Sequence, residues 1–205
     1  MLITIEGIDG SGKSSLITSL EVSLADLAPV MTREPGESWV GTSVRRAIAE
    51  EIDPVAEALL FVADHAVHLA TVVRPALEKN QLVICDRYTD SRYAYQQVTL
   101  EGLVPEPLTW LRQVHNEWTI PPDLTFLLVL PVEVALYRRS GRAEREHFEY
   151  ASLLTKVQEN YLSLAREDPS RFIIVDAEKD EKEIHQFIAD AIRSAVARSR
   201  SHHRH

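Results

Sequence analysis

Short apolar segments separated by longer helical patterns recur along this chain. The apolar segments cover residues 2–5, 30–31, 82–85, 124–130 and 172–175. Between them, apolar residues repeat at spacings of three and four, which is typical of amphipathic helices. Strands that alternate with helices pair in parallel, and the helices then cover both faces of the sheet. The pattern therefore predicts an α/β fold built on a five-stranded parallel sheet.

The first apolar segment leads directly into a phosphate-binding pattern, G-x-x-x-x-G-K-[ST], at residues 7–14. Glycines let the loop turn backbone N–H groups toward a polyphosphate, the charge of Lys13 can follow a transferred phosphoryl group, and the Ser14 hydroxyl is placed to hold Mg²⁺. A helix is expected to follow, with an apolar stripe at Leu16, Leu20, Leu24 and Leu27. We therefore expect a P-loop NTPase fold. The expected ATP-binding residues are Gly7, Asp9, Gly10, Ser11, Gly12, Lys13, Ser14 and Ser15.

Length fits one domain, because 205 residues of which 45% are apolar can bury an adequate core. We expect this domain to span residues 1–197, with an arginine-rich lid near 138–149. The polar, basic residues 198–205 are expected to form a disordered end.

Charge and cysteine content exclude several classes of protein. A formal net charge of −9 argues against general nucleic-acid binding, because duplex affinity comes largely from Lys and Arg against phosphates. The single cysteine, Cys85, rules out an internal disulfide and lies in an apolar run that favours buried packing. The apolar stretch 126–130 is far too short to span a bilayer, and the first strand leaves no room for a signal peptide. We therefore expect a cytoplasmic protein without a membrane partner.

Residues that directly follow the strands are the first candidates for ligand binding, since ligands of parallel sheets gather at the carboxyl ends of the strands. Asp86 follows the apolar residues 82–85 and is the expected second Mg²⁺ partner beside Ser14. The alternative is that Asp86 caps a helix. Arg87 can make a bidentate contact with a phosphate.

Segment 54–73 carries two stripes at helical spacing. The first, expected to face the core, contains Val55, Leu59, Val62, Ala66, Leu69 and Val73. The second contains Phe61, His65 and His68, and indicates a surface that faces a ligand or a partner. The alternative is that Phe61 extends the core and the histidines are solvated.

The order of these motifs resembles that of the thymidylate kinases. The motifs are residues 6–14 with the phosphate loop, Thr-Arg-Glu-Pro-Gly at 32–36, Leu-Leu-Phe at 59–61, Asp-Arg-Tyr at 86–88, then Ser91, Ala-Tyr-Gln at 94–96 and Pro-Asp-Leu at 122–124. The resemblance covers nearly the whole chain. It implies transfer of the ATP γ-phosphoryl group to dTMP on a nucleoside monophosphate kinase core, with Mg²⁺, and usually in a homodimer.

The same resemblance implies roles in binding dTMP. It implies that Phe61 stacks on thymine, that Tyr95 packs beneath the deoxyribose, and that Asp9 reaches the 3′-hydroxyl. Arg33 and Arg87 would contact the acceptor phosphate. Gln96, the last residue of the Ala-Tyr-Gln motif, would also bind dTMP.

At position 65, the family commonly has an arginine that donates to the base carbonyl, and this chain has His65. We expect His65 to bind dTMP too, since a histidine can still donate one hydrogen bond, but its side chain is shorter and mostly uncharged at neutral pH. Our hypothesis is that Arg92 supplies the missing donor. The alternative is that Arg92 points to solvent and water fills the gap.

Residues 138–145 contain four arginines in an otherwise acidic chain. A charge run is usually a solvated helix face. However, phosphoryl transfer needs mobile cations, and the family divides into members with a base in the phosphate loop and members with catalytic arginines in the lid. The loop interior has no basic residue, so the resemblance implies the lid-arginine type. The expected catalytic residues are Lys13, Arg87, Arg142, Arg145 and Arg139.

Two other functions stay open from the sequence. The first is another nucleoside monophosphate or deoxynucleoside kinase with relaxed base choice, because His65 and Arg92 depart from the family pattern. The second is a nucleotide-dependent switch ATPase, which would leave Phe61, Tyr95 and Arg33 without a role.

Overall fold

The computed structural model describes residues 1–138 and 144–202, with side chains described for these except in 144–149 and 200–202. Within these ranges, five parallel strands form one sheet in the order β2-β3-β1-β4-β5. The strands are β1 (Leu2–Gly7), β2 (Val30–Arg33), β3 (Val83–Asp86), β4 (Leu124–Val129) and β5 (Phe172–Asp176). All coincide with the apolar segments of the sequence, so the predicted fold class is confirmed.

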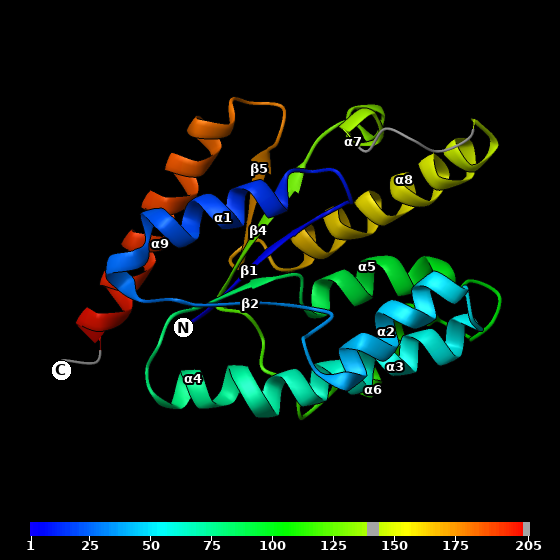
Figure 1. Cartoon of the computed structure of the whole chain (residues 1–205), viewed down its shortest axis with the longest axis horizontal. Helices are drawn as coiled ribbons and strands as arrows, with labels where there is room; N and C mark the ends of the chain where they lie inside the picture. Colours follow the sequence, from blue (N-terminus) through cyan, green and yellow to red (C-terminus); the bar gives the residue numbers. More distant parts are fainter. Residues whose placement is uncertain (139–143, 203–205) are drawn as a thin grey trace.

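Helices cover both sides of the sheet. In Figure 1, α1 and α9 lie together on one side of the strands, and α5 and α8 lie on the other. The helical segments are α1 (Lys13–Ser23), η1 (Ala25–Leu27), α2 (Trp39–Glu50), α3 (Pro54–His68), the π-helical η2 (Leu69–Val73), α4 (Arg74–Glu78), α5 (Thr89–Thr99), α6 (Pro107–His115), α7 (Val132–Arg138), α8 (Glu144–Glu167) and α9 (Glu181–His202).

The core is centred on β1, of which every residue is buried. Leu16, Leu20 and Leu24 pack into it as the stripe after the loop predicts. Cys85 is also buried, and burial raises the pKa of its thiol well above the ordinary value. A buried thiol of this kind packs as a small apolar group.

Helix α3 buries a polar side and exposes an apolar one. Its buried residues are Ala58, Asp64, His65 and His68. Its exposed residues are Ala56, Leu59, Ala63 and Ala66. The predicted core face is therefore wrong at Leu59 and Ala66, whereas Val55 is half-buried against a core cluster and Leu69 and Val73 in η2 are fully buried. The cause is a buried network of polar partners, described with the site.

The run from Pro54 to Glu78 forms a continuous helical rod. Its 25 residues have a mean hydropathy of 1.4 in the most apolar window, so by length and composition alone it could cross a membrane. Only 28% of the window is buried in the protein. The rod therefore presents apolar surface to its surroundings.

The end of the chain also differs from expectation. Helix α9 continues to His202, so residues 198–202, expected to be disordered, are helical.

Candidate active site

Lys13 is held against the phosphate loop that joins β1 to α1. Its ammonium group donates to the carbonyl oxygens of Gly7 at 3.0 Å and Ile8 at 2.9 Å, and to Ser11 Oγ at 3.4 Å. Only 6% of the residue is exposed. Burial, with the nearby charge of Arg87, lowers the pKa of Lys13 to about 7. The loop thus places a buried cation where a phosphate is expected.

Two glycines give the loop its shape. Gly10 and Gly12 have φ angles of +86° and +94°, which L side chains rarely adopt. A Cβ at Gly10 would lie 2.3 Å from the carbonyl oxygen of Ala135 in α7. Glycine at position 10 therefore allows α7 to pack directly onto the loop.

A cavity of about 660 Å³ opens over the phosphate loop. Asp86 and Arg87 line it from the end of β3, and Arg138 lines it from the end of α7. Arg138 also donates to the carbonyl oxygen of Ala177 at 3.3 Å, which fixes its guanidinium beside the loop. The loop residues in the lining are Asp9, Gly10, Gly12, Lys13, Ser14 and Ser15, all predicted from the motif.

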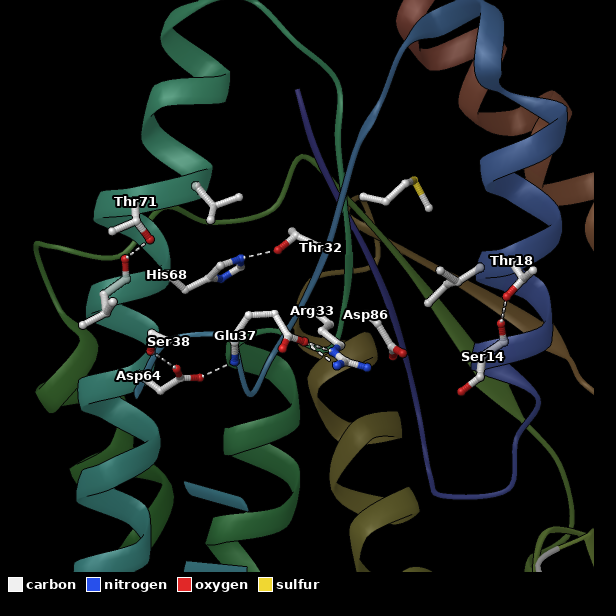
Figure 2. Close-up of a pocket in the computed structure, with 15 residues that line it drawn as sticks. Ser14, Thr18, Thr32, Arg33, Glu37, Ser38, Asp64, His68, Thr71 and Asp86 are labelled. Carbon is white, nitrogen blue, oxygen red and sulfur yellow. Dashed lines mark hydrogen bonds and ion pairs between the residues drawn. The ribbon is translucent and has the colours of Figure 1, made fainter. Parts of the chain in front are cut away.

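Ser14 and Asp86 are positioned as a cation site requires. Both line this cavity and also the neighbouring groove shown in Figure 2. Asp86 Oδ1 is buried and has no hydrogen-bond partner among the described residues, which fits a carboxylate that is to face a cation. Within the same residues, no group of three or more His, Cys, Asp or Glu side chains could hold a metal. A metal here would need oxygens from a bound nucleotide.

A second cavity, of about 380 Å³, adjoins the first. We call it the acceptor cavity. It brings together the predicted residues Asp9, Phe61, Arg87, Arg92, Tyr95 and Gln96. Asp9 and Arg87 line both cavities. The arrangement gives two adjoining compartments with a shared wall that contains one carboxylate and one guanidinium.

Arg87 is the centre of that shared wall. Its guanidinium donates to the carbonyl oxygen of Gly7 at 3.1 Å and to Ser91 Oγ at 3.2 Å, and forms an ion pair with Asp9. It also stacks on the ring of Tyr95, 5.1 Å from the centroid. The Tyr95 hydroxyl accepts from the backbone N–H of Asp9 at 3.0 Å. Arg87 therefore connects the phosphate loop with α5.

Glu34, just beyond β2, organises a buried polar network beside the acceptor cavity. One carboxylate oxygen accepts from Nδ1 of His65 at 2.8 Å and of His68 at 2.7 Å, and the other pairs with Arg92. Burial alone would raise the pKa of Glu34, but Arg92 and His65 hold it well below its usual range. His65 is itself a poor base, because burial and the charge of Arg92 lower its pKa to about 4. The network therefore pairs a carboxylate with a guanidinium and includes a neutral imidazole at His65.

Two predicted dTMP-binding residues do not line the acceptor cavity. His65 is fully buried, with Nε2 bonded to Thr119 Oγ1 at 2.7 Å, so it faces the network and neither a ligand nor a partner. Arg33 is exposed, pairs with Glu37, and lines the groove of Figure 2. In both cases a nearby carboxylate holds the side chain away from the cavity, Glu34 for His65 and Glu37 for Arg33.

The predicted lid arginines are only partly described. Arg139 and Arg142 lie outside the described residues. Arg145 is in the first turns of α8, but its side chain is outside the described part of the structure.

Sequence reasoning missed four residues that shape the site. Glu34 could have been found, because it follows a strand end. Arg138 belongs to the arginine run, but nothing in the sequence distinguishes it from the others. Tyr150 donates to Asp9 Oδ2 at 2.7 Å, and no pattern points to it. Glu6 accepts from Ser91 Oγ at 2.6 Å and from the Tyr88 N–H at 2.7 Å; it begins the phosphate-loop motif, but the sequence assigns it no role.

Comparison with known proteins agrees with this geometry. The family model "Thymidylate kinase" matches residues 5–188. A probable thymidylate kinase of Methanoculleus marisnigri is 60% identical over 200 residues, covering 98% of each chain. One of Methanospirillum hungatei is 61% identical over 193 residues, covering 94% of each. The crystal structure of a thymidylate kinase from Ehrlichia chaffeensis superposes with a TM-score of 0.72 at 27% identity, over 94% of this chain and 98% of the other. The chain belongs to the thymidylate kinase family.

Proposed function

We propose that this enzyme transfers the γ-phosphoryl group of ATP to dTMP, giving dTDP and ADP. The observation that carries the proposal is the pair of adjoining cavities with Asp9 and Arg87 in their common wall. One cavity is built from the phosphate loop and suits ATP. The other contains an aromatic ring, Phe61, and a tyrosine, Tyr95, which suit a nucleoside monophosphate. The names of the relatives identify that monophosphate as dTMP.

Catalysis in this arrangement is positioning and charge stabilisation. The acceptor phosphate is already ionised, so no strong general base is needed, and two phosphates must be held in line while negative charge is offset. Lys13 lies on the ATP side, and Arg87 lies between the cavities. We assign the acceptor phosphate to Arg87 and the γ-phosphoryl group to Lys13.

Further positive charge is assigned to the arginines that follow β4. The loop interior, residues 8–11, offers no basic side chain. We therefore propose the lid-arginine type, in which Arg142 and Arg145, with Arg139, cover the transferring group. Arg138 already lines the ATP cavity and joins this set.

Ser14 and Asp86 would hold Mg²⁺ together with the nucleotide. The buried, unpartnered Asp86 Oδ1 supports this assignment. A bound Mg²⁺ supplies charge neutralisation at the β- and γ-phosphates. The protein residues themselves fix where the triphosphate lies.

On the acceptor side, we assign the base to Phe61 and the sugar to Tyr95, Asp9 and Gln96. Tyr95 is half-buried, and its hydroxyl is held by the backbone N–H of Asp9 while its ring packs against the Arg87 guanidinium, so the ring is a fixed wall of the cavity. A rigid wall beneath C2′ would reject a ribose hydroxyl by steric clash.

We further propose that the enzyme is a cytoplasmic homodimer. Support comes from α3, whose apolar residues Ala56, Leu59, Ala63 and Ala66 are exposed at spacings of three and four. Apolar residues in such a row favour packing against another helix.

A panel of monophosphates tests the proposed activity. Purified enzyme is given Mg²⁺ and ATP with dTMP, dUMP, dCMP, dGMP or UMP, and ADP release is followed in a coupled assay. We expect dTMP to give the highest kcat/KM. Preference for another monophosphate would contradict the choice of acceptor, and equal ADP release without any monophosphate would indicate a switch ATPase.

A further inference from the structure

Arg92 is buried against the acceptor cavity with one end of its guanidinium unused. Only 2% of the residue is exposed. Nε donates to His115 Nε2 at 3.1 Å, and Nη1 pairs with Glu34. Nη2 is buried and has no hydrogen-bond partner among the described residues, although Arg92 lines the cavity. An unpaired buried donor is unfavourable, so this nitrogen should acquire an acceptor when the cavity fills.

The neighbouring histidines have no donor to offer. His65 uses Nδ1 on Glu34 and Nε2 on Thr119, and His68 uses Nδ1 on Glu34 and Nε2 on Thr32. His115 Nδ1 donates to the carbonyl oxygen of Leu111 at 2.7 Å, which leaves Nε2 as the acceptor for Arg92. Among Arg92 and these three histidines, Arg92 Nη2 is therefore the donor left for a ligand, within the described residues.

The orientation of a bound nucleotide follows from the two arginines of the cavity. Arg87 is bonded to the phosphate loop at Gly7, whereas Arg92 is bonded to Glu34 and to α6. With the acceptor phosphate at Arg87, the edge of the base farthest from the sugar points toward Arg92. In a pyrimidine, that edge carries the substituent at C4, a carbonyl in thymine and uracil and an amino group in cytosine.

We propose that Arg92 Nη2 donates a hydrogen bond to the C4 carbonyl of the bound pyrimidine and thereby selects thymine and uracil against cytosine. This inference rests on the proposed function. A guanidinium has donors only, so it cannot pair with an amino group, and two facing donors leave both unsatisfied. Specificity at C4 then comes from a side chain of α5.

Glu34 and His115 act as positioning residues for this contact. They hold Nη1 and Nε of the planar fork, which fixes the direction of Nη2. His65 occupies the other side of the same carboxylate. An arginine at position 65 would reach Glu34 from α3 and could present a guanidinium to the cavity in place of Arg92.

The unaltered enzyme provides the first test. We compare kcat/KM for dTMP with that for 5-methyl-dCMP, which keeps the methyl group and sugar and changes the C4 substituent. We expect 5-methyl-dCMP to be poorer by about 10-fold to 100-fold. Equal use of the two would overturn the inference while leaving the kinase activity in place. Failure to phosphorylate dTMP itself would instead overturn the proposed function.

A variant then identifies the residue responsible. Arg92→Lys keeps a positive charge opposite Glu34 but loses the fork. We expect KM for dTMP to rise about tenfold or more, with a smaller effect on kcat, and the preference for dTMP over 5-methyl-dCMP to fall by a similar factor. The matched control is Arg112→Lys in α6, where the arginine is about half exposed and pairs with Glu167, and the preference should not change.

A rescue separates recognition from loss of structure. Adding His65→Arg to Arg92→Lys should restore the preference for dTMP, because a guanidinium again pairs with Glu34. Thermal unfolding and ATP binding show whether each variant is folded. If folded Arg92→Lys keeps the wild-type preference, Arg92 is not the discriminating residue and the inference is wrong.

Discussion

The ammonium group of Lys13 is buried, which makes its charged form unfavourable until a phosphate binds beside it. Burial and the neighbouring Arg87 bring the pKa of Lys13 to about 7, so much of it is neutral above that pH. A triphosphate favours the ammonium form and raises this pKa. We therefore predict that ATP binding takes up a proton at pH 8, and that ATP affinity falls as pH rises above 7, by up to about tenfold per unit.

Calorimetric titration of the enzyme with ATP at pH 8, in buffers with different heats of ionisation, measures this uptake directly. Lys13→Met should abolish it along with most of the affinity. A binding heat independent of the buffer would show that Lys13 is already charged in the free enzyme.

Gly10 illustrates a second constraint at single residues. In Gly10→Ala, the new Cβ would lie 2.3 Å from the Ala135 carbonyl oxygen, and a backbone atom cannot move aside as a flexible side chain can. Gly102 also has a positive φ, +75°, but a Cβ added there would meet nothing within 4 Å. We predict that Gly102→Ala costs about 1 to 2 kcal/mol in the free energy of unfolding, from backbone strain alone. Gly10→Ala should cost more and weaken ATP binding. Denaturant unfolding of both variants tests this, and equal losses would contradict the packing of α7 on the loop.

At the scale of elements, α3 joins two surfaces of opposite character. Its buried side supplies two histidines to the network around Glu34, and its exposed side is a row of alanines with Leu59, which is 48% exposed. A charge placed in that row would be desolvated on association. We predict that Leu59→Asp shifts the protein from dimer to monomer in size-exclusion chromatography with light scattering.

Phe187→Asp in α9 serves as the control for that experiment, because Phe187 is similarly exposed, at 51%, and lies on a different helix. It should leave the dimer intact. A wild-type monomer, or a Leu59→Asp dimer, would contradict the assigned interface.

Helix α3 also shows where sequence patterns stop being informative. The strands and the phosphate loop could be predicted because each signal is local: an apolar run, or a glycine pattern followed by Lys13 and Ser14. The inward face of α3 could not, since helical periodicity assumes that the apolar side is the buried one. Its polar side is buried because Glu34 accepts from both histidines and is itself paired with Arg92, and those two residues come from the end of β2 and from α5.

The same limit explains the site residues. Phe61, Arg87 and Tyr95 reach the acceptor cavity as the resemblance implies. His65 does not, because its partners are a strand end and Thr119, more than fifty positions away in the chain. Arg92 stands out in the sequence by its departure from the family pattern. What the sequence could not supply is its pairing with Glu34, which decides that only one guanidinium nitrogen is left for a ligand.

For the whole molecule, buried titratable groups set how stability varies with pH. His65 and His115 are both fully buried, and burial together with the charge of Arg92 lowers the pKa of each from 6.5 to about 4. Their contribution to stability is present above pH 6.5 and is lost as pH falls through 4. Glu6 acts in the opposite direction. Burial and the charge of Asp90 raise its pKa from 4.5 to about 7, so its contribution is present below pH 4.5 and is lost as pH rises through 7.

Between about pH 5 and 6.5, the unfolded chain therefore binds two more protons at the histidines, and the folded protein binds one more at Glu6. The net difference of one proton predicts that the free energy of unfolding falls by about 1.4 kcal/mol per pH unit on acidification in this window. Denaturant unfolding at fixed protein concentration measures the slope. His115→Gln removes one of the two histidines that bind a proton only in the unfolded chain, so the slope should fall close to zero. His185→Gln in α9 is the control for loss of a histidine outside the network. An unchanged slope in His115→Gln would mean that burial beside Arg92 does not keep His115 neutral. The neutral form in which His115 Nε2 accepts from Arg92 Nε would then be contradicted.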